Sequence, residues 1–159
     1  MKLSLDEVMN NYQDSVFKAA FYILKDRYDA EDVVQETFLS YYKEGKEFEG
    51  PEHIKNWLLR IAINKSKNIT ASFWRKKRDN IDDYIENLYF EMPEDKNLLR
   101  EVLRLPEKCR VIVHLYYYEG YSIKEIASII GLSENTIKSQ LHRGRKLLKD
   151  RLEEEWVDE

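Results

Sequence analysis

The chain has 159 residues, of which 43% are hydrophobic and 13% aromatic, and it carries a formal net charge of −4. This length suits one ordinary domain or two small ones, and the apolar content argues against a globally disordered chain. The single cysteine, Cys109, excludes an internal disulfide, and no apolar run approaches the roughly 18 residues that span a membrane. Acidic residues also stand where a signal peptide has its apolar core, so we expect a cytoplasmic protein with no membrane insertion of its own.

Few glycines and prolines, and few runs of period two, predict an all-α protein. Apolar residues at helical spacing predict one or two helices in residues 5–26. Asp29 is expected to cap a second helix, which reads AEDVVQETFLSYYK, and the loop EGKEFEGPE separates it from a third helix at about 52–73. Residues 1–78 are therefore assigned to a first helical domain.

The charges are distributed unevenly along the chain. Lys55–Arg78 holds eight basic residues and no acidic one, whereas residues 79–99 hold seven acidic residues and a single basic one. A second acid-free stretch, NTIKSQLHRGRKLLK, lies near the end of the chain. Because the electrostatic footprint of a nucleic-acid site is local, the net negative charge does not argue against DNA binding. We predict two small helical domains joined by an acidic linker at 79–95, with the second domain at 96–159; the alternative is that each basic run is only a solvated helix face.

The second domain is predicted to hold four helices, at about 96–104, 107–118, 123–130 and 134–152. The last two, in YSIKEIASIIGLSENTIKSQLHRGRKLL, have the signature of a helix-turn-helix. Ser122 and Glu125 can form a capping box ahead of the first of these helices. Gly131 suits the left-handed residue that ends it, and Ser133 can cap the second. The shared core is expected to contain Ile126, Ile130, Leu132, Ile137, Leu141 and Leu148.

The face of the last helix opposite this core is polar and basic. Such side chains donate hydrogen bonds to base edges and hold phosphates when a helix lies in the major groove of DNA. The alternative, an ordinary helical hairpin with a polar exterior, accounts less well for the caps, the glycine and the lack of acids occurring together. The residues predicted to contact DNA are Asn135, Lys138, Ser139, His142, Arg143 and Lys146.

The first basic stretch has a different chemistry. In HIKNWLLRIAINKSKNITASFWRKKR, Asn64 lies at the edge of an apolar helix face beside Trp57, with Arg60 and Lys67 further round. Exposed bases are held by stacking, hydrogen bonds and backbone cations, so an amide beside a ring among cations suits them. The alternative is that Trp57 is a plain core residue, and the functional interpretation depends on the second DNA-binding module that follows.

Four segments in order resemble the small bacterial sigma factors of the extracytoplasmic-function (ECF) group over roughly residues 5–152: DAEDVVQETFLSYYK, WLLRIAINKSKN, an acidic linker, and LPEKCRVIVHLYYYEGYSIKEIASIIGLSENTIKSQLHRGRKLLKDRL. The resemblance implies a two-domain helical subunit, without catalysis of its own, that directs RNA polymerase to promoters. Its first domain would engage the minus-ten element and help open the duplex, and its second would read the minus-thirty-five element. The implied partners are promoter DNA, an anti-sigma factor, and core RNA polymerase through the clamp helices and flap of its large subunits.

The same resemblance implies roles for individual residues. With Phe38 on the buried face of the second helix, the residues that contact polymerase would be Asp29, Asp32, Gln35, Glu36 and Leu39; without the resemblance, this helix would be interpreted as amphipathic with a solvated acidic face. The residues around a pocket for a flipped minus-ten base would be Phe48, Trp57 and Asn64, flanked by Arg60 and Lys67. The match adds Gln140 to the minus-thirty-five contacts. Gln140 and His142 stand where relatives often carry other aromatic or basic residues, and this departure leaves the recognised promoter sequence open.

A second class of function shares the same DNA-binding motif. An autonomous helix-turn-helix regulator would combine it with an N-terminal domain that senses a ligand or a partner. DAEDVVQETF followed by WLLRIAIN favours the sigma factor, because a regulator has no need of that order. No catalytic residue, metal site or cofactor is predicted, since His53, His114 and His142 are scattered, no ligand spacing surrounds Cys109 and no glycine-rich phosphate loop occurs.

Overall fold

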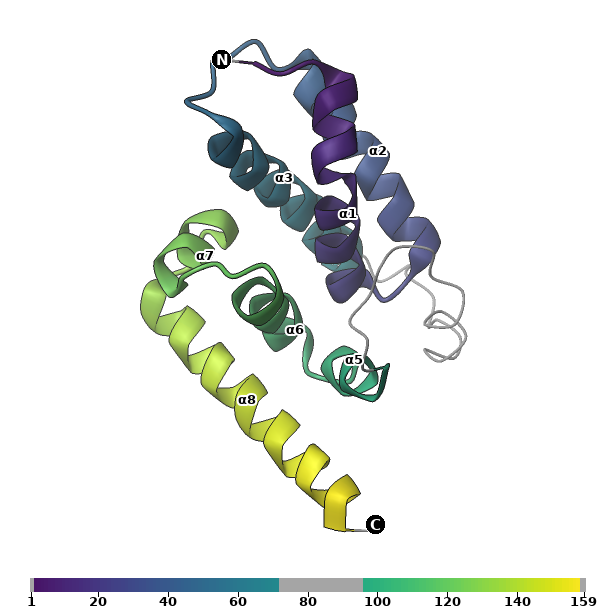
Figure 1. Cartoon of the computed structure of the whole chain (residues 1–159), viewed down its shortest axis with the longest axis vertical. Helices are drawn as coiled ribbons and strands as arrows, with labels where there is room; N and C mark the ends of the chain where they lie inside the picture. The colour runs from purple at the N-terminus through teal and green to yellow at the C-terminus, as the bar shows by residue number, and fades with distance from the viewer. Residues whose placement is uncertain (1, 72–95, 158–159) are drawn as a thin grey trace. The chain divides into compact units, whose positions relative to one another are not determined.

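The computed structural model describes residues 2–71 and 96–157. Every regular element in these ranges is a helix, which confirms the predicted all-α class (Figure 1). The chain divides into two compact units, Met1–Arg78 and Asp79–Glu159. The acidic linker predicted at 79–95 lies outside the described residues.

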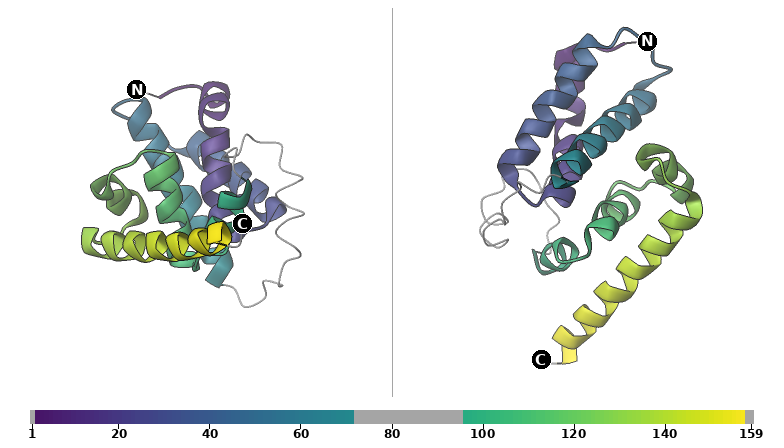
Figure 2. Two further views of the ribbon diagram at one scale, coloured as in Figure 1. Left: turned by 60° about the horizontal axis from the view of Figure 1, so that its bottom comes forward. Right: turned by 180° about the vertical axis from the view of Figure 1, so that it is seen from behind.

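The N-terminal unit is a bundle of three helices, each packed against the other two: α1 (Leu5–Leu24), α2 (Arg27–Lys43) and α3 (Pro51–Ala71). Figure 2 shows the same three helices side by side from behind. Burying one large apolar side chain contributes about 1.5–3 kcal/mol, so the residues between the helices stabilise the bundle. Those that are 3% exposed or less include Phe17, Phe21, Ile23, Leu24, Phe38, Tyr41, Ile54, Leu58, Leu59 and Ile63.

The turn between α1 and α2 differs from the prediction. Asp26, and not Asp29, caps α2: the N–H of Asp29 donates to Oδ1 of Asp26 at 2.8 Å. Lys25 ends α1 in the left-handed region, at φ 54°, and donates its N–H to the carbonyl oxygen of Phe21. Only Lys25, the C-cap of α1, and Asp26, the N-cap of α2, therefore connect the two helices. Asp29 falls in the first turn of α2 instead, where a carboxylate is stabilised by the helix dipole.

The C-terminal unit contains α5 (Lys96–Leu103), α6 (Glu107–Val113), the π-helical turn η1 (His114–Tyr118), α7 (Ile123–Ile130) and α8 (Glu134–Val157). Helix α8 packs against α5, α6 and α7, so the predicted four-helix arrangement with a terminal helix-turn-helix is confirmed (Figure 1). The buried residues of this unit include Leu99, Leu103, Leu105, Cys109, Ile112, Leu115, Ile126, Ile137 and Leu141.

A π-helical turn ends the helix that the sequence predicted at 107–118. Glu119 donates its N–H to the carbonyl oxygen of His114, five residues back, at 3.2 Å. His114 is 3% exposed, and its ring stacks on that of Tyr118 with the centroids 5.3 Å apart. The wider turn keeps His114 in the core, while Tyr117 and Tyr118 are about half exposed.

Buried charge joins α5 to α8. The side chain of Glu101 is 5% exposed, with Oε1 2.9 Å from Nη1 of Arg104 and Oε2 3.7 Å from Nη1 of Arg151. A buried carboxylate without a partner is strongly destabilising, and the two guanidinium groups supply partners for Glu101. Arg151 belongs to α8, and the pair therefore fixes α5 against the helix that carries the predicted DNA contacts.

Candidate nucleic-acid and polymerase interfaces

The turn between α7 and α8 uses the residues that the sequence predicted. Oγ of Ser122 accepts from the N–H of Glu125 at 3.1 Å, and Oε1 of Glu125 accepts from the N–H of Ser122 at 3.0 Å, which completes a capping box at the start of α7. Gly131 ends α7 at φ 84°, and its N–H donates to the carbonyl oxygen of Ala127. Because a Cβ is strained at this φ, glycine determines how the chain turns into α8.

Helix α8 is held close to α6. Oγ of Ser133 accepts from the N–H of Thr136 at 3.1 Å and caps the helix, as predicted, and Ile137 is fully buried. Gly144 is buried too, and a Cβ added there would lie 2.8 Å from Cγ2 of Val113 on α6. Real Cβ atoms essentially never lie so close to another atom, so only glycine permits this approach. The outer face of α8 is thereby set in one orientation.

The predicted core of the helix-turn-helix is confirmed for most of its members. The buried ones are Ile126, Ile130, Ile137 and Leu141. Leu148 is half-buried. The prediction is wrong for Leu132, which is 42% exposed. Its N–H follows that of Gly131 in donating to the carbonyl oxygen of Ala127, and this closing of the helix end leaves the Leu132 side chain outside the α7–α8 contact.

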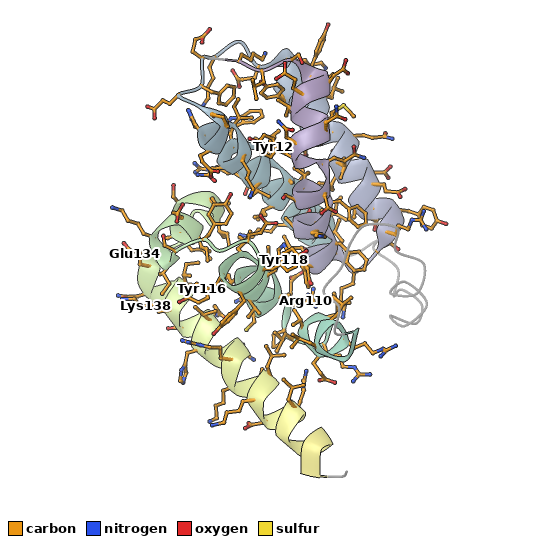
Figure 3. All side chains as sticks on the ribbon, in the orientation of Figure 1. Tyr12, Arg110, Tyr116, Tyr118, Glu134 and Lys138 are labelled. Carbon is orange, nitrogen blue, oxygen red and sulfur yellow. The ribbon has the colours of Figure 1, made fainter. Side chains whose placement is uncertain are left out.

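The face of α8 that points away from the core of its unit is exposed over about three turns. Figure 3 shows Lys138 projecting outward from the helix. No acidic side chain stands between Asn135 and Lys149. Cations and hydrogen-bond donors without competing carboxylates can contact base edges and phosphates together. The predicted contacts that are exposed here are Asn135, Lys138, Ser139, His142, Arg143 and Lys146.

Gln140 is placed differently from the other predicted contacts. Its side chain is half-buried, and its Oε1 accepts a hydrogen bond from Sγ of Cys109 at 3.3 Å. Cys109 is buried on α6, and this burial raises the pKa of its thiol, against the opposing influence of the Arg143 and Arg110 guanidinium groups. Gln140 therefore lies at the edge of the outer face, in contact with the core.

Helix α3 carries the second line of predicted DNA contacts. Trp57, Arg60, Asn64 and Lys67 recur at steps of three and four residues, which places them along one helix face. Arg60, Asn64 and Lys67 are exposed, and Trp57 is half-buried. This face combines part of an aromatic ring with one amide and two cations, as the sequence predicted.

Aromatic rings support Trp57 within the bundle. Its ring centroid lies 5.7 Å from that of Phe48 and 6.3 Å from that of Tyr41, both in edge-on arrangements. Phe48 is 2% exposed and also contacts His53, whose Nδ1 accepts from the N–H of Glu49 at 3.0 Å. Phe48 thus lies beneath the surface and holds Trp57 in position.

Helix α2 exposes a stripe that mixes acidic, amide and large apolar side chains. Asp29 is half-buried, and the exposed members of the predicted polymerase contacts are Asp32, Gln35, Glu36 and Leu39. Two tyrosines that were not predicted as contacts lie on the same face: Tyr28 is 69% exposed and Tyr42 is 67% exposed. Positions 28, 32, 35, 39 and 42 follow alternate steps of four and three, a spacing that marks one helix face and was visible in the sequence.

One ion pair connects the α2 stripe with the basic helix. Oε2 of Glu36 lies 3.7 Å from Nζ of Lys65 on α3, and the two side chains are 61% and 32% exposed. A pair this exposed contributes about 0–1 kcal/mol. Either side chain can therefore leave the other for a stronger partner at little cost.

The described ranges hold no group of three His, Cys, Asp or Glu side chains that could bind a metal ion. His114 is buried, with Nε2 4.0 Å from Oε1 of Glu119, and His53 and His142 belong to different units. Within the same part of the chain, no helix is long and apolar enough to cross a membrane.

Family models match both units of the chain. The sigma-70 region 2 model matches residues 8–79, and the sigma-70 region 4 model matches residues 95–148. Two helical units with these domains, in this order, define a sigma factor of RNA polymerase.

Curated relatives narrow the class. The chain is 30% identical to the ECF RNA polymerase sigma factor SigM of Bacillus subtilis, over 92% of this chain and 94% of that protein. It is 27% identical to the ECF RNA polymerase sigma factor SigW of the same organism, over 92% of this chain and 87% of that protein. The chain belongs to the ECF sigma factor family.

Solved structures share the fold. The chain is similar to the sigma factor RpoE of Bartonella quintana, solved with the anti-sigma factor NepR, with a TM-score of 0.71 and 19% identity over 93% of this chain and 96% of that chain. It is also similar to CnrH, solved with the cytosolic domain of CnrY, with a TM-score of 0.67 and 21% identity over 94% of this chain and 87% of that chain.

Proposed function

We propose that this protein binds core RNA polymerase and directs it to begin transcription at promoters of a defined sequence, with no catalysis of its own. The observation that carries the proposal is the presence of two differently built basic faces, on α8 and on α3, in two separate units of one chain. Membership of the ECF sigma factor family supports the same function. The protein acts in the cytoplasm, where polymerase and chromosome meet.

The second domain, residues 96–159, reads the minus-thirty-five element as duplex DNA. Helix α8 enters the major groove, with its N-terminal turns nearest the base edges. Ser139, His142 and the amide of Gln140 contact bases, while the cations along the same face hold phosphates on either side. The close approach of α8 to α6 at Gly144 fixes how deeply the helix enters the groove.

The first domain, residues 1–78, holds the minus-ten element after it opens. A base that leaves the stack loses a few kcal/mol of stacking and pairing, which the protein must offset. Trp57, supported by Phe48, offers a ring for stacking, and Asn64 offers both a donor and an acceptor. Arg60 and Lys67 lie on the same face and hold the backbone of the single strand.

The α2 stripe docks on the clamp helices of the large polymerase subunits. An amphipathic helix docks through side chains at steps of three and four, and Tyr28, Leu39 and Tyr42 supply apolar anchors of this kind. Asp32 and Glu36 supply the charge that steers the encounter. The acidic segment at 79–95 joins the two domains, and the second domain also contacts the flap.

An anti-sigma factor is the expected inhibitory partner. The similar structure of RpoE was solved with the anti-sigma factor NepR, and the present chain shares its fold over 93% of its length. An inhibitor that covers the α2 stripe would compete with core polymerase for the same residues. Adding such a protein should lower transcription, and excess core polymerase should restore it.

A reconstituted run-off assay tests the proposed function. Core polymerase with this protein should start transcription at a fixed position on a template that carries the cognate promoter, and core polymerase alone should not. The alternative is an autonomous helix-turn-helix regulator. That alternative replaces the proposal if the isolated protein binds promoter DNA tightly and never changes initiation by the core enzyme.

A further inference from the structure

The hydrogen bond between Cys109 and Gln140 determines which end of the Gln140 amide is available to DNA. A glutamine side chain carries an acceptor oxygen at one end and two N–H donors at the other. In this structure Oε1 faces the core and accepts from Sγ of Cys109 at 3.3 Å. Nε2 makes no hydrogen bond to any residue in the described ranges. The end of Gln140 left for a ligand is therefore the donor end.

The position of the thiol is fixed by the packing of α6 on α8. Cys109 is fully buried, and a Cβ built on Gly144 would lie 3.5 Å from Cβ of Cys109. Residues 140 and 144 are one helical turn apart, so this close approach also holds Sγ beside Gln140. Burial raises the pKa of the thiol, so at neutral pH the sulfur keeps its proton and acts as the donor.

We propose that Cys109 holds Gln140 as a donor-only reader, so that Gln140 selects a guanine at one position of the minus-thirty-five element. The inference rests on the proposed role of α8 in reading that element. Guanine presents two adjacent acceptors, N7 and O6, in the major groove, whereas cytosine presents an N4 donor. Gln140 is the specificity-determining residue, and Cys109 is a positioning residue that acts through it.

The hydrogen bond between Cys109 and Gln140 should also make adenine a poorer partner than guanine. A free glutamine pairs with adenine in two hydrogen bonds, donating to N7 and accepting from N6. Gln140 cannot make this pair while its Oε1 accepts from Cys109, because a single oxygen at the core edge does not also reach the base. Release of Gln140 from Cys109 should therefore admit adenine at the position that guanine occupied.

Selection from a promoter library tests this assignment. The library consists of promoter duplexes randomised over the upstream element, and the reader is the holoenzyme formed from core polymerase and the full-length chain. Wild-type holoenzyme should select guanine at one position. Cys109→Ala, which removes the donor, should reduce the preference for guanine over adenine at that position about tenfold, or about 1.4 kcal/mol. Cys109→Ser, which keeps a hydroxyl donor, should preserve the preference.

A change in Gln140 provides the second arm. Gln140→Glu still accepts from Cys109 but turns an acceptor toward the base, so the selected base at the same position should change to cytosine. Each preference is a ratio between DNAs bound by one preparation, so a partly unfolded variant does not alter it. The inference is overturned if Cys109→Ala leaves the preference at every position unchanged, or if wild-type holoenzyme selects cytosine at the position that Gln140→Glu changes. If wild-type holoenzyme selects no upstream sequence, the proposed minus-thirty-five role fails, and this inference fails with it.

Discussion

The two proposed DNA faces differ in what lies beneath them. The predicted contacts on α8 that are exposed are polar or basic, whereas the face of α3 includes Trp57, with Phe48 and Tyr41 packed against its ring. Paired bases present only their edges in a groove, and hydrogen-bonding groups suffice to read them. An unstacked base has lost its neighbours and needs a ring to replace them. Reading duplex DNA and holding an opened strand require different surfaces, and the two proposed faces, which lie in separate units, differ in this way.

The largest expected effect comes from disrupting the close contact between α8 and α6 at Gly144. Gly144→Val would place carbon atoms against Val113, where an added Cβ already comes within 2.8 Å. Overpacking of this kind costs about 1–3 kcal/mol, and we expect a loss near the upper end of that range. The C-terminal unit should melt at a lower temperature, and upstream promoter binding should be lost. Differential scanning calorimetry and a duplex binding assay would measure both.

Gly45→Val is the matched control for this change. A Cβ at Gly45 meets no atom within 4 Å, and the residue lies in the other unit. The free energy of unfolding of the Gly45→Val variant should differ from that of the parent by less than about 0.5 kcal/mol, as for ordinary surface substitutions. Equal destabilisation by the two variants would mean that valine itself, and not the α6–α8 contact, is responsible.

Replacement of one cation should show that the α8 face acts through charge. Arg143→Ala should weaken binding to upstream duplex DNA by about 2 kcal/mol and reduce the salt dependence of that binding by about one unit of slope if the contact is to phosphate. Arg145→Ala is the control, because it removes the same charge from the same helix at a position about 200° away around the axis. Titrations at several salt concentrations, with circular dichroism to verify folding, would measure the effect. If both variants lost the same DNA affinity, the α8 helix would act only through its overall positive charge, and not through a specific contact of Arg143.

The α3 face should respond differently, because its proposed contribution is to the opened strand. Asn64→Ala should lower the extent of promoter opening by an amount equivalent to about 1 kcal/mol, the typical worth of one hydrogen bond, while leaving closed-complex binding unchanged. Permanganate reactivity of the melted region would report opening. Asn10→Ala makes the same chemical change on the exposed surface of α1 and serves as control. Unaltered opening by Asn64→Ala at saturating protein would remove Asn64 from the mechanism.

Much of this architecture was predictable because local signals and packing agree. The capping box at Ser122 and Glu125, and the left-handed Gly131, each depend on neighbours within a few residues, so the sequence alone placed the turn of the helix-turn-helix. The start of α2 was misplaced because two aspartates, Asp26 and Asp29, could both cap it. The left-handed conformation of Lys25, which decides between them, has no clear signal in a residue that is not glycine.

The candidate site was predictable to the extent that it depends on helical periodicity. The outer face of α8 and the face of α3 were predictable from residues spaced three and four apart. The same spacing would have identified Tyr28 and Tyr42 on α2. Contacts between distant parts of the sequence were not predictable in this way. The hydrogen bond from Cys109 to Gln140 joins residues 31 positions apart, and the π-helical turn at 114–118 depends on how His114 packs.

The smallest expected effect concerns the ion pair between Glu36 and Lys65, which joins the α2 stripe to helix α3. Glu36→Gln should change the stability of the N-terminal unit by no more than about 0.5 kcal/mol, because the pair is exposed. The same change releases Lys65, so affinity of the free protein for single-stranded DNA should rise about twofold at low salt and not measurably at 0.15 M salt, where charges are screened within about 8 Å.

Asp32→Asn removes the same charge from a residue with no ion pair among the described residues, and it should have a smaller effect. In a Lys65→Met background, Glu36→Gln should add nothing further, as a double-mutant cycle would show. An equal rise with Asp32→Asn would mean that only the overall charge matters, and not the pairing of Glu36 with Lys65.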